Sequence, residues 1–173
     1  MSSKLTTRTK LAEMKNIFSD RYYTQPNTIW GFTSGAFDIL HIQHIKYLQQ
    51  ARKHLEKLHP FYNIILVVGI NSDESIKALK GPNRPIVPEE ERAEIIAALE
   101  CVDFVFIFDE QNNNKNIETL EPDYYIKGGD YKPEQMTSTK LMKEWGGQAL
   151  IIPPEDISAS TTNIIDTILE RFR

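Results

Sequence analysis

The stretch GFTSGAFDILHIQH, residues 31–44, decides the fold class of this chain. It begins inside an apolar run, residues 28–32, and continues through the small residues at 33–35. After it, apolar residues recur at the spacing of one helix face: Ile45, Leu48, Ala51, Leu55 and Leu58. The pattern therefore predicts a strand, a small-residue turn and a helix, in that order.

Two histidines, His41 and His44, lie three positions apart at the expected start of this helix. Residues three apart share a helical face, so the first turn of the helix can direct both imidazoles at one phosphate. The small-residue turn exposes backbone N–H groups, and a helix N-terminus adds a dipole that favours anions. Asp38, between turn and helix, has the residue type of a helix cap. Although paired histidines are often ordinary surface residues, this combination indicates a phosphate site.

Length and composition are those of one globular domain. The chain has 173 residues, 40% of them apolar and 25% charged, and its net charge of -4 argues against general nucleic-acid binding. The one cysteine, Cys101, excludes an internal disulfide and is expected in the core. No apolar run is long enough to cross a bilayer, and the N-terminus lacks the run of a signal peptide. We therefore expect a cytoplasmic domain with neither a membrane nor a nucleic-acid partner.

Strands and helices alternate along the chain. Strands are predicted at 28–32, 64–68, 104–108, 124–126 and 149–152, and helices at 5–19, 45–58, after Ser72 or Asp73, after Pro88, at 117–120, at 135–145 and after Ser160. This alternation is typical of a doubly wound α/β fold with a parallel sheet. We expect a single domain, with residues 1–27 as an N-terminal helix and lead-in and 28–173 as the nucleotide-binding core.

Polar loops follow the predicted strands at 33–44, 71–84, 127–131 and 158–162. In doubly wound folds ligands bind beyond the carboxyl ends of the strands, so these loops should line one pocket. They and their neighbourhood carry several cations: Lys77, Lys80, Arg84, Arg92 and Lys127. Such a group suits a ligand with several phosphates.

These features resemble the cytidylyltransferase-like nucleotidyltransferases, whose signature H-x-G-H follows a strand and a Phe-Asp dipeptide. His41 and His44 occupy that signature, with Gln43 where the family has glycine. The resemblance runs from about Leu11 to Ile168, over FTSGAFDILH, VGINSDESIKALKGPNRPI, ERAEIIAALECVDFVFIFDE, LEPDYYIKGGDY and the closing STT. Within the family it is strongest to the adenylyltransferases that act on D-glycero-β-D-manno-heptose 1-phosphate.

The resemblance implies a Rossmann-like nucleotidyltransferase fold and a reaction that joins AMP from ATP to a sugar 1-phosphate. The products would be pyrophosphate and an ADP-sugar, here ADP-heptose for lipopolysaccharide or another surface glycan. Mg²⁺ would arrive with ATP, without a metal site of the protein's own, and a homodimer is expected. Bacteria often fuse this domain to a sugar kinase, so the chain would be the stand-alone form.

Residue by residue, the resemblance implies catalytic roles for His41, His44 and Lys80. The two histidines would hydrogen-bond the phosphates while the α-phosphorus is attacked, and Lys80 would hold the acceptor phosphate. Nucleotide-binding roles are implied for Thr33, Gly35, Phe37, Arg92, Lys127, Gly128, Asp130, Ser160, Thr161 and Thr162.

Two alternatives stay open. One is a CTP-dependent cytidylyltransferase acting on glycerol phosphate or a similar alcohol phosphate. Such enzymes tend to carry an arginine a few residues before Ser-Thr-Thr, whereas residues 153–156 read PPED, which favours ATP. The other is a nucleotide-binding module with impaired catalysis, because Gln43 replaces the motif glycine.

Overall fold

The strand at the start of the quoted stretch lies at the centre of the sheet. The computed structural model describes residues 2–19, 27–129, 137–153 and 159–172. Five parallel strands pair in the order β3-β2-β1-β4-β5, and their bounds are β1 (Thr28–Gly35), β2 (Asn63–Asn71), β3 (Phe104–Phe108), β4 (Tyr124–Gly128) and β5 (Gln148–Ile152). Because β1 pairs with both β2 and β4, the direction of winding reverses between β1 and β4.

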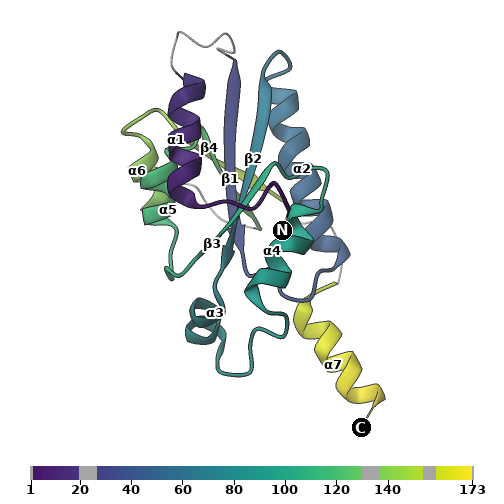
Figure 1. Cartoon of the computed structure of the whole chain (residues 1–173). Coiled ribbons are helices and arrows are strands. Elements are labelled where there is room, and N and C mark those ends of the chain that lie inside the picture. Colours follow the sequence, from purple (N-terminus) through teal and green to yellow (C-terminus); the bar gives the residue numbers. More distant parts are fainter. Residues whose placement is uncertain (1, 20–26, 130–136, 154–158, 173) are drawn as a thin grey trace.

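Helices cover both faces of this sheet (Figure 1). One face carries α1 (Arg8–Ser19), α5 (Asn114–Leu120) and α6 (Thr137–Met142), and the other carries α2 (Ile42–Leu58) and α4 (Glu89–Ala97). Two further helices, α3 (Asp73–Lys80) and α7 (Thr161–Arg171), lie beyond the carboxyl ends of the strands. The prediction of a single-domain, doubly wound, Rossmann-like α/β fold is confirmed.

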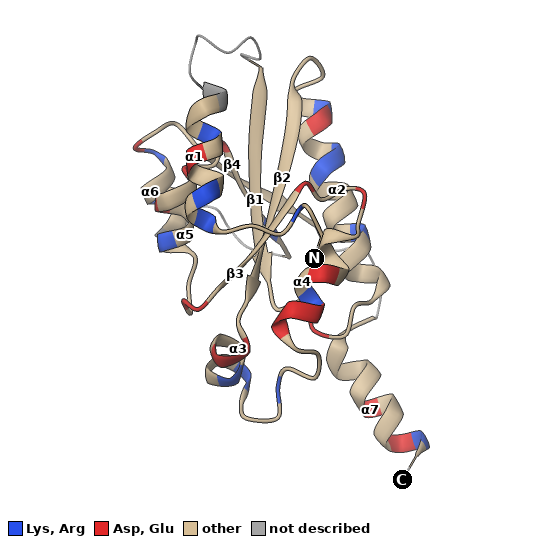
Figure 2. Ribbon diagram, in the orientation of Figure 1, with Lys and Arg blue, Asp and Glu red and all other residues tan. Residues whose placement is uncertain are grey.

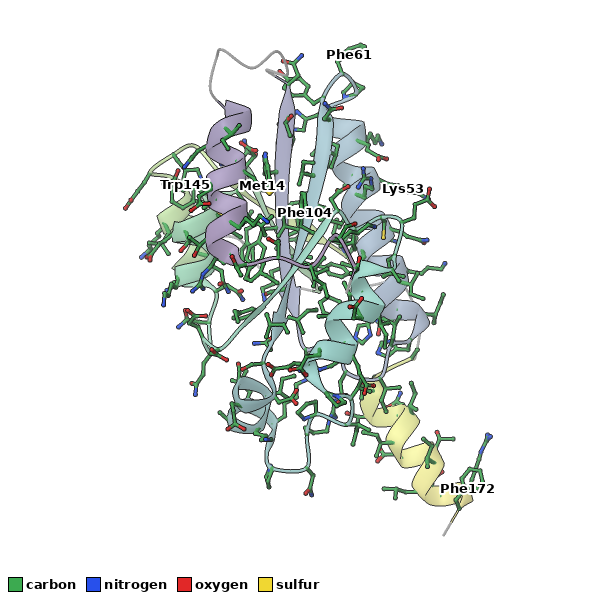
Figure 3. The ribbon with its side chains drawn as sticks, viewed as in Figure 1. Met14, Lys53, Phe61, Phe104, Trp145 and Phe172 are labelled. Carbon is green, nitrogen blue, oxygen red and sulfur yellow. The ribbon has the colours of Figure 1, made fainter. Side chains whose placement is uncertain are left out.

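Apolar side chains fill the space between the sheet and each helical layer. On the α1 face, Phe32 stacks with Phe106 and Tyr125, with ring centroids 5.8 and 5.7 Å apart. Partly buried side chains also pack against this cluster, among them Met14, Phe104 and Trp145 (Figure 3). Strands covered on both faces need apolar residues on both, which explains the near-continuous apolar runs in the sequence.

The first glycine of the quoted stretch lets α2 approach the sheet closely. A Cβ at Gly31 would lie 2.5 Å from Cδ1 of Leu55, so a side chain there would force the Leu55 side chain on α2 to shift. The Leu55 side chain thereby packs directly over the backbone of β1 at Gly31.

The N-terminal helix is shorter than predicted because the residues before it pair with the sheet. Thr6 donates its N–H to the Val105 carbonyl, and the Val105 N–H donates to the Lys4 carbonyl, each at 3.0 Å. Leu5 thereby forms a parallel bridge to Val105 in the edge strand β3. The predicted helix over 5–19 therefore starts at Arg8, since backbone groups used in a bridge are not available to a helix.

The last helix extends away from the body of the molecule (Figure 1). Its predicted apolar residues, Ile164, Ile165 and Ile168, form one side of α7, but no residue of α7 is buried. Phe172, just beyond its end, is 83% exposed (Figure 3). Within the described ranges, no helix combines the length and the apolar character needed to cross a membrane.

Candidate active site

A pocket opens where β1 and β4 end, at the predicted edge of the sheet. Its larger part, of about 430 Å³, is lined by α2, the α3–α4 loop and the start of α7, and we call it the α2 part. Its smaller part, of about 260 Å³, is lined by residues 34–38, and we call it the β1 part. The two parts share five lining residues: His44, Tyr47, Lys80, Gly128 and Thr161.

His41 and His44 stack against each other at the N-terminus of α2. Their ring centroids are 3.7 Å apart with an interplanar angle of 23°, and both residues line the α2 part. The prediction that both lie in the first helical turn is wrong for His41, which is the N-cap residue with extended backbone (φ -138°, ψ 169°). Its carbonyl still accepts the first hydrogen bond of the helix, from the His44 N–H at 3.0 Å, as is typical of an N-cap residue.

The two imidazoles are neutral at pH 7 in this environment. Burial lowers the pKa of His41, and burial together with His41 and Lys80 lowers the pKa of His44 to about 4. The Nδ1 atoms of both rings are buried and have no hydrogen-bond partner among the described residues. Within the described residues, one ring nitrogen of each histidine therefore makes no hydrogen bond.

Lys80 and Arg84 supply positive charge on the opposite wall. Figure 2 shows Lys and Arg on α3 and on the loop that follows it, and both residues line the α2 part. Burial and the nearby Arg84 lower the pKa of Lys80. Lys77, predicted with them, is different: it is exposed, pairs with Glu74 at 2.8 Å and lines neither part.

Arg92 lines neither part of the pocket, although the resemblance implies a role for it in binding the nucleotide. Its side chain is 1% exposed and donates to the carbonyls of Val87 and Asn71, both at 2.8 Å, and to that of Ala36. It also pairs with the Asp73 carboxylate at 2.7 Å. With these acceptors around it, the guanidinium ties together the loops that form the pocket.

Thr33 is likewise buried away from the pocket. Its hydroxyl lies 2.7 Å from the Tyr47 hydroxyl, which donates to the Ile126 carbonyl at 3.1 Å. Burial raises the pKa of Tyr47, so the phenol stays protonated. The Tyr47 ring also packs on Gly128, where a Cβ would come within 3.0 Å of it. The Thr33 side chain therefore supports the wall of the pocket, and its implied role at the nucleotide stays a prediction.

Gly35 and Phe37 line the β1 part, as expected. Phe37 has a φ of +43°, and a Cβ at Gly35 would lie 3.0 Å from the Phe37 ring. The turn therefore needs glycine at 35 to accept the folded-back phenyl group. The edge of that group meets His44, with centroids 5.2 Å apart.

The start of α7 and the end of β4 complete the lining. Ser160, Thr161 and Thr162 line the α2 part, and Ser160 caps α7 by accepting from the Asn163 N–H at 3.1 Å. Lys127 and Gly128 line the β1 part. Asp130 and most of the PPED segment (154–156) lie outside the described residues, so the expectations attached to them stay predictions.

Acidic residues contribute little to the described lining. Among the described residues that line the two parts of the pocket, Asp38 is the single acidic one. Its carboxylate is already bonded to the loop after α3. Nowhere in the described ranges do three or more His, Cys, Asp or Glu side chains gather closely enough to hold a metal ion.

Several residues of α2 that line the pocket were not predicted from the sequence. Tyr47 and Gln50 line the α2 part together with Gln43, and so does Lys46. The signal was present, because positions four and seven after Gln43 fall on its face of a helix. Ile152 and Pro153 also line the pocket, and only the pairing of β5 with β4 brings them there.

Comparison with known proteins agrees with this geometry. The family model described as Cytidylyltransferase-like matches residues 32–167. The chain is 48% identical over 141 residues to the Bifunctional protein HldE of Syntrophotalea carbinolica, and 48% identical over 137 residues to that of Geotalea uraniireducens. These matches cover 82% and 79% of the chain but 27% and 26% of the relatives, so the chain spans about a quarter of their length.

A solved structure is similar as well. The lipopolysaccharide core biosynthesis protein of Thermoplasma volcanium superposes with a TM-score of 0.55 and 27% identity, over 75% of this chain and 98% of that one. The family match covers most of the chain, including the paired histidines and the pocket loops. The chain therefore belongs to the cytidylyltransferase-like family and is a nucleotidyltransferase.

Proposed function

We propose that the chain transfers AMP from ATP to a sugar 1-phosphate, with D-glycero-β-D-manno-heptose 1-phosphate as the acceptor. The observation that carries this proposal is the stacked, neutral pair His41 and His44 facing Lys80 in one pocket. The choice of ATP and of heptose rests on the sequence resemblance. It is supported by the HldE relatives and by the lipopolysaccharide core biosynthesis protein among similar structures.

The reaction needs positioning and charge stabilisation more than acid–base chemistry. An ionised oxygen of the acceptor phosphate attacks the α-phosphorus of ATP, and the bond from that phosphorus to the oxygen bridging to the β-phosphate breaks. Pyrophosphate leaves with the bridging oxygen, so no proton has to move. Neutral imidazoles would donate N–H hydrogen bonds to the phosphate oxygens as negative charge shifts to the leaving group.

The remaining polar groups suit the other phosphates. The N-terminus of α7 at Ser160 to Thr162 offers backbone N–H groups and a positive dipole end to the β- and γ-phosphates. Lys80, which lines both parts of the pocket, would take the acceptor phosphate. Mg²⁺ would enter as the MgATP complex, held by phosphate oxygens, since the Asp38 carboxylate is occupied.

A pyrophosphate-release assay tests the proposal. The protein is incubated with Mg²⁺ and either ATP or CTP, and with heptose 1-phosphate, other sugar phosphates or glycerol phosphate as acceptors. Pyrophosphate and ADP-heptose, identified by mass, are expected with ATP and the heptose. Turnover only with CTP would favour a cytidylyltransferase. Binding of ATP without turnover on any acceptor would favour the impaired module that Gln43, a lining residue, suggests.

Assembly and location follow from the same proposal. We expect a homodimer, as the sequence resemblance implies, and a cytoplasmic enzyme, because ATP and sugar phosphates are available there. Light scattering coupled to gel filtration measures the mass in solution, for which the dimer predicts about twice the 20.0 kDa of the chain. A mass of one chain at micromolar concentration would contradict the dimer without affecting the proposed reaction.

A further inference from the structure

Asp38 is a buried carboxylate whose two oxygens are bonded to one loop. The residue is 2% exposed. Its Oδ2 accepts from Nε of Arg84 at 2.7 Å, and its Oδ1 accepts from the backbone N–H groups of Ile86 and Val87, each at 3.0 Å. Asp38 therefore does not cap α2, and its charge is directed at the loop that closes the pocket.

Among the described residues, the Arg84 guanidinium is held on one side only. Asp38 bonds its Nε, and no further hydrogen bond joins its two terminal amino groups to the described part of the chain. Arg84 lines the α2 part of the pocket beside Lys80. An arginine fixed through Nε keeps both terminal amino groups in one plane, a geometry that matches two oxygens of a phosphate group.

The loop that carries Arg84 is clamped from two directions. Val87 donates its N–H to Asp38 and accepts at its carbonyl from Nε of Arg92, at 2.8 Å. Arg92 also donates to the carbonyl of Ala36, two residues before Asp38. The loop and the turn after β1 are thus joined by two buried charged side chains, so Arg84 extends from a fixed base.

We propose that Asp38 is a positioning residue, which fixes Arg84 so that its terminal amino groups bind two oxygens of a substrate phosphate group. The inference rests on the proposed function for the identity of the substrates. The phosphate belongs either to the sugar 1-phosphate or to the triphosphate of ATP, and the same chemistry recognises both. Without the carboxylate, Arg84 loses its fixed orientation and binds phosphate more weakly.

Calorimetric titration of the full chain tests this with three separate ligands: inorganic pyrophosphate, MgATP and the sugar 1-phosphate. The variants are Asp38→Asn, Arg84→Ala and the double variant. We expect both single variants to weaken binding of the same ligand about tenfold. The ligand that is affected identifies the phosphate group that Arg84 binds. The double variant should be no weaker than Arg84→Ala, because the carboxylate acts through the arginine. The proposal would be overturned if the affinity losses of the two single variants multiplied in the double variant. It would also be overturned if Arg84→Ala left the affinity for all three ligands unchanged.

Asp103→Asn is the matched control. Asp103 also pairs with an arginine and a backbone amide, accepting from Arg52 and from the Leu66 N–H, each at 2.7 Å, but it lies outside the pocket. It should lower stability without changing phosphate binding, and an Asp38→Asn variant that behaves in the same way would assign Asp38 a purely structural role.

Two further variants keep the test decisive. If Asp38→Asn does not fold, Asp38→Ser replaces it. Arg84→Lys should bind phosphate more weakly than the wild type, because one ammonium group cannot bond Asp38 and span two phosphate oxygens. An Arg84→Lys variant with the affinity of the wild type would contradict the role of the planar guanidinium. Wild-type protein that binds pyrophosphate through Arg84 but releases none from any triphosphate would refute the proposed reaction and leave the role of Asp38 intact.

Discussion

The imidazole rings of His41 and His44 stack with their centroids 3.7 Å apart, although only His44 belongs to the helix. The N-cap geometry of His41 turns its ring over the first turn of α2, where it covers His44. Burial lowers the pKa of both rings, and the neighbouring His41 lowers the pKa of His44 further. The pair is therefore suited to donate neutral hydrogen bonds to phosphate oxygens.

The first prediction concerns these two rings. His41→Ala and His44→Ala should each lower kcat by about 100-fold, the usual effect of removing a donor that stabilises a transition state. Steady-state pyrophosphate release measures the effect, and thermal unfolding shows that the fold is kept. His54→Ala, an exposed position on the same helix, is the control. Near-normal kcat in either site variant would remove that histidine from the mechanism.

The second prediction is a pH dependence of stability. The pKa of His44 is about 4 in the folded protein against 6.5 in the unfolded chain, so the unfolded state binds more protons between these values. The free energy of unfolding should therefore fall as the pH is lowered from 6.5 towards 4, with a slope of up to about 1.4 kcal/mol per pH unit from this group.

Denaturant unfolding across this pH window measures that slope. His44→Gln should remove the contribution of this one proton, up to about 1.4 kcal/mol per pH unit of the slope. The control His54→Gln, at an exposed position, should leave the slope unchanged. An identical slope in wild type and His44→Gln would mean that His44 titrates normally in the folded state.

The third prediction separates the two substrates at Lys80. Lys80→Ala should raise the KM for the sugar phosphate more than the KM for ATP, because its loop would close over the acceptor. Lys77→Ala, on the same helix but paired with Glu74 in solvent, should change neither KM. Equal increases in both KM values would assign Lys80 to the nucleotide.

The fourth prediction concerns Gln43, which lines the pocket where the family motif has glycine. If its side chain obstructs the nucleotide, Gln43→Gly should raise affinity for ATP, or kcat/KM, by about tenfold, equivalent to about 1.4 kcal/mol. Gln49→Gly, exposed on the same helix, controls for the helix-destabilising effect of glycine of about 1 kcal/mol. Unchanged affinity and turnover would show that the Gln43 side chain is accommodated.

Local patterns in the sequence were sufficient for the elements and for the edge of the sheet that holds the pocket. The strand at residues 104–108 was predicted with its observed bounds, and of the predicted caps, Ser72 or Asp73 and Ser160 to Thr162, the structure uses Ser72 and Ser160. These features depend on neighbours within a few residues, so periodicity and capping chemistry record them directly. The bridge of Leu5 to the edge strand was missed, because its partner lies far along the chain.

By itself, the sequence determined the doubly wound fold and the edge of the sheet at which the pocket lies, because both follow from the order of strands and helices. The tertiary structure decided which polar side chains face the pocket and which support it. Thr33 and Arg92 turned out to be buried supports, and Asp38 bonds Arg84 across 46 positions of sequence. A hydrogen-bond partner so distant is set by how the elements pack, and no local pattern encodes that packing.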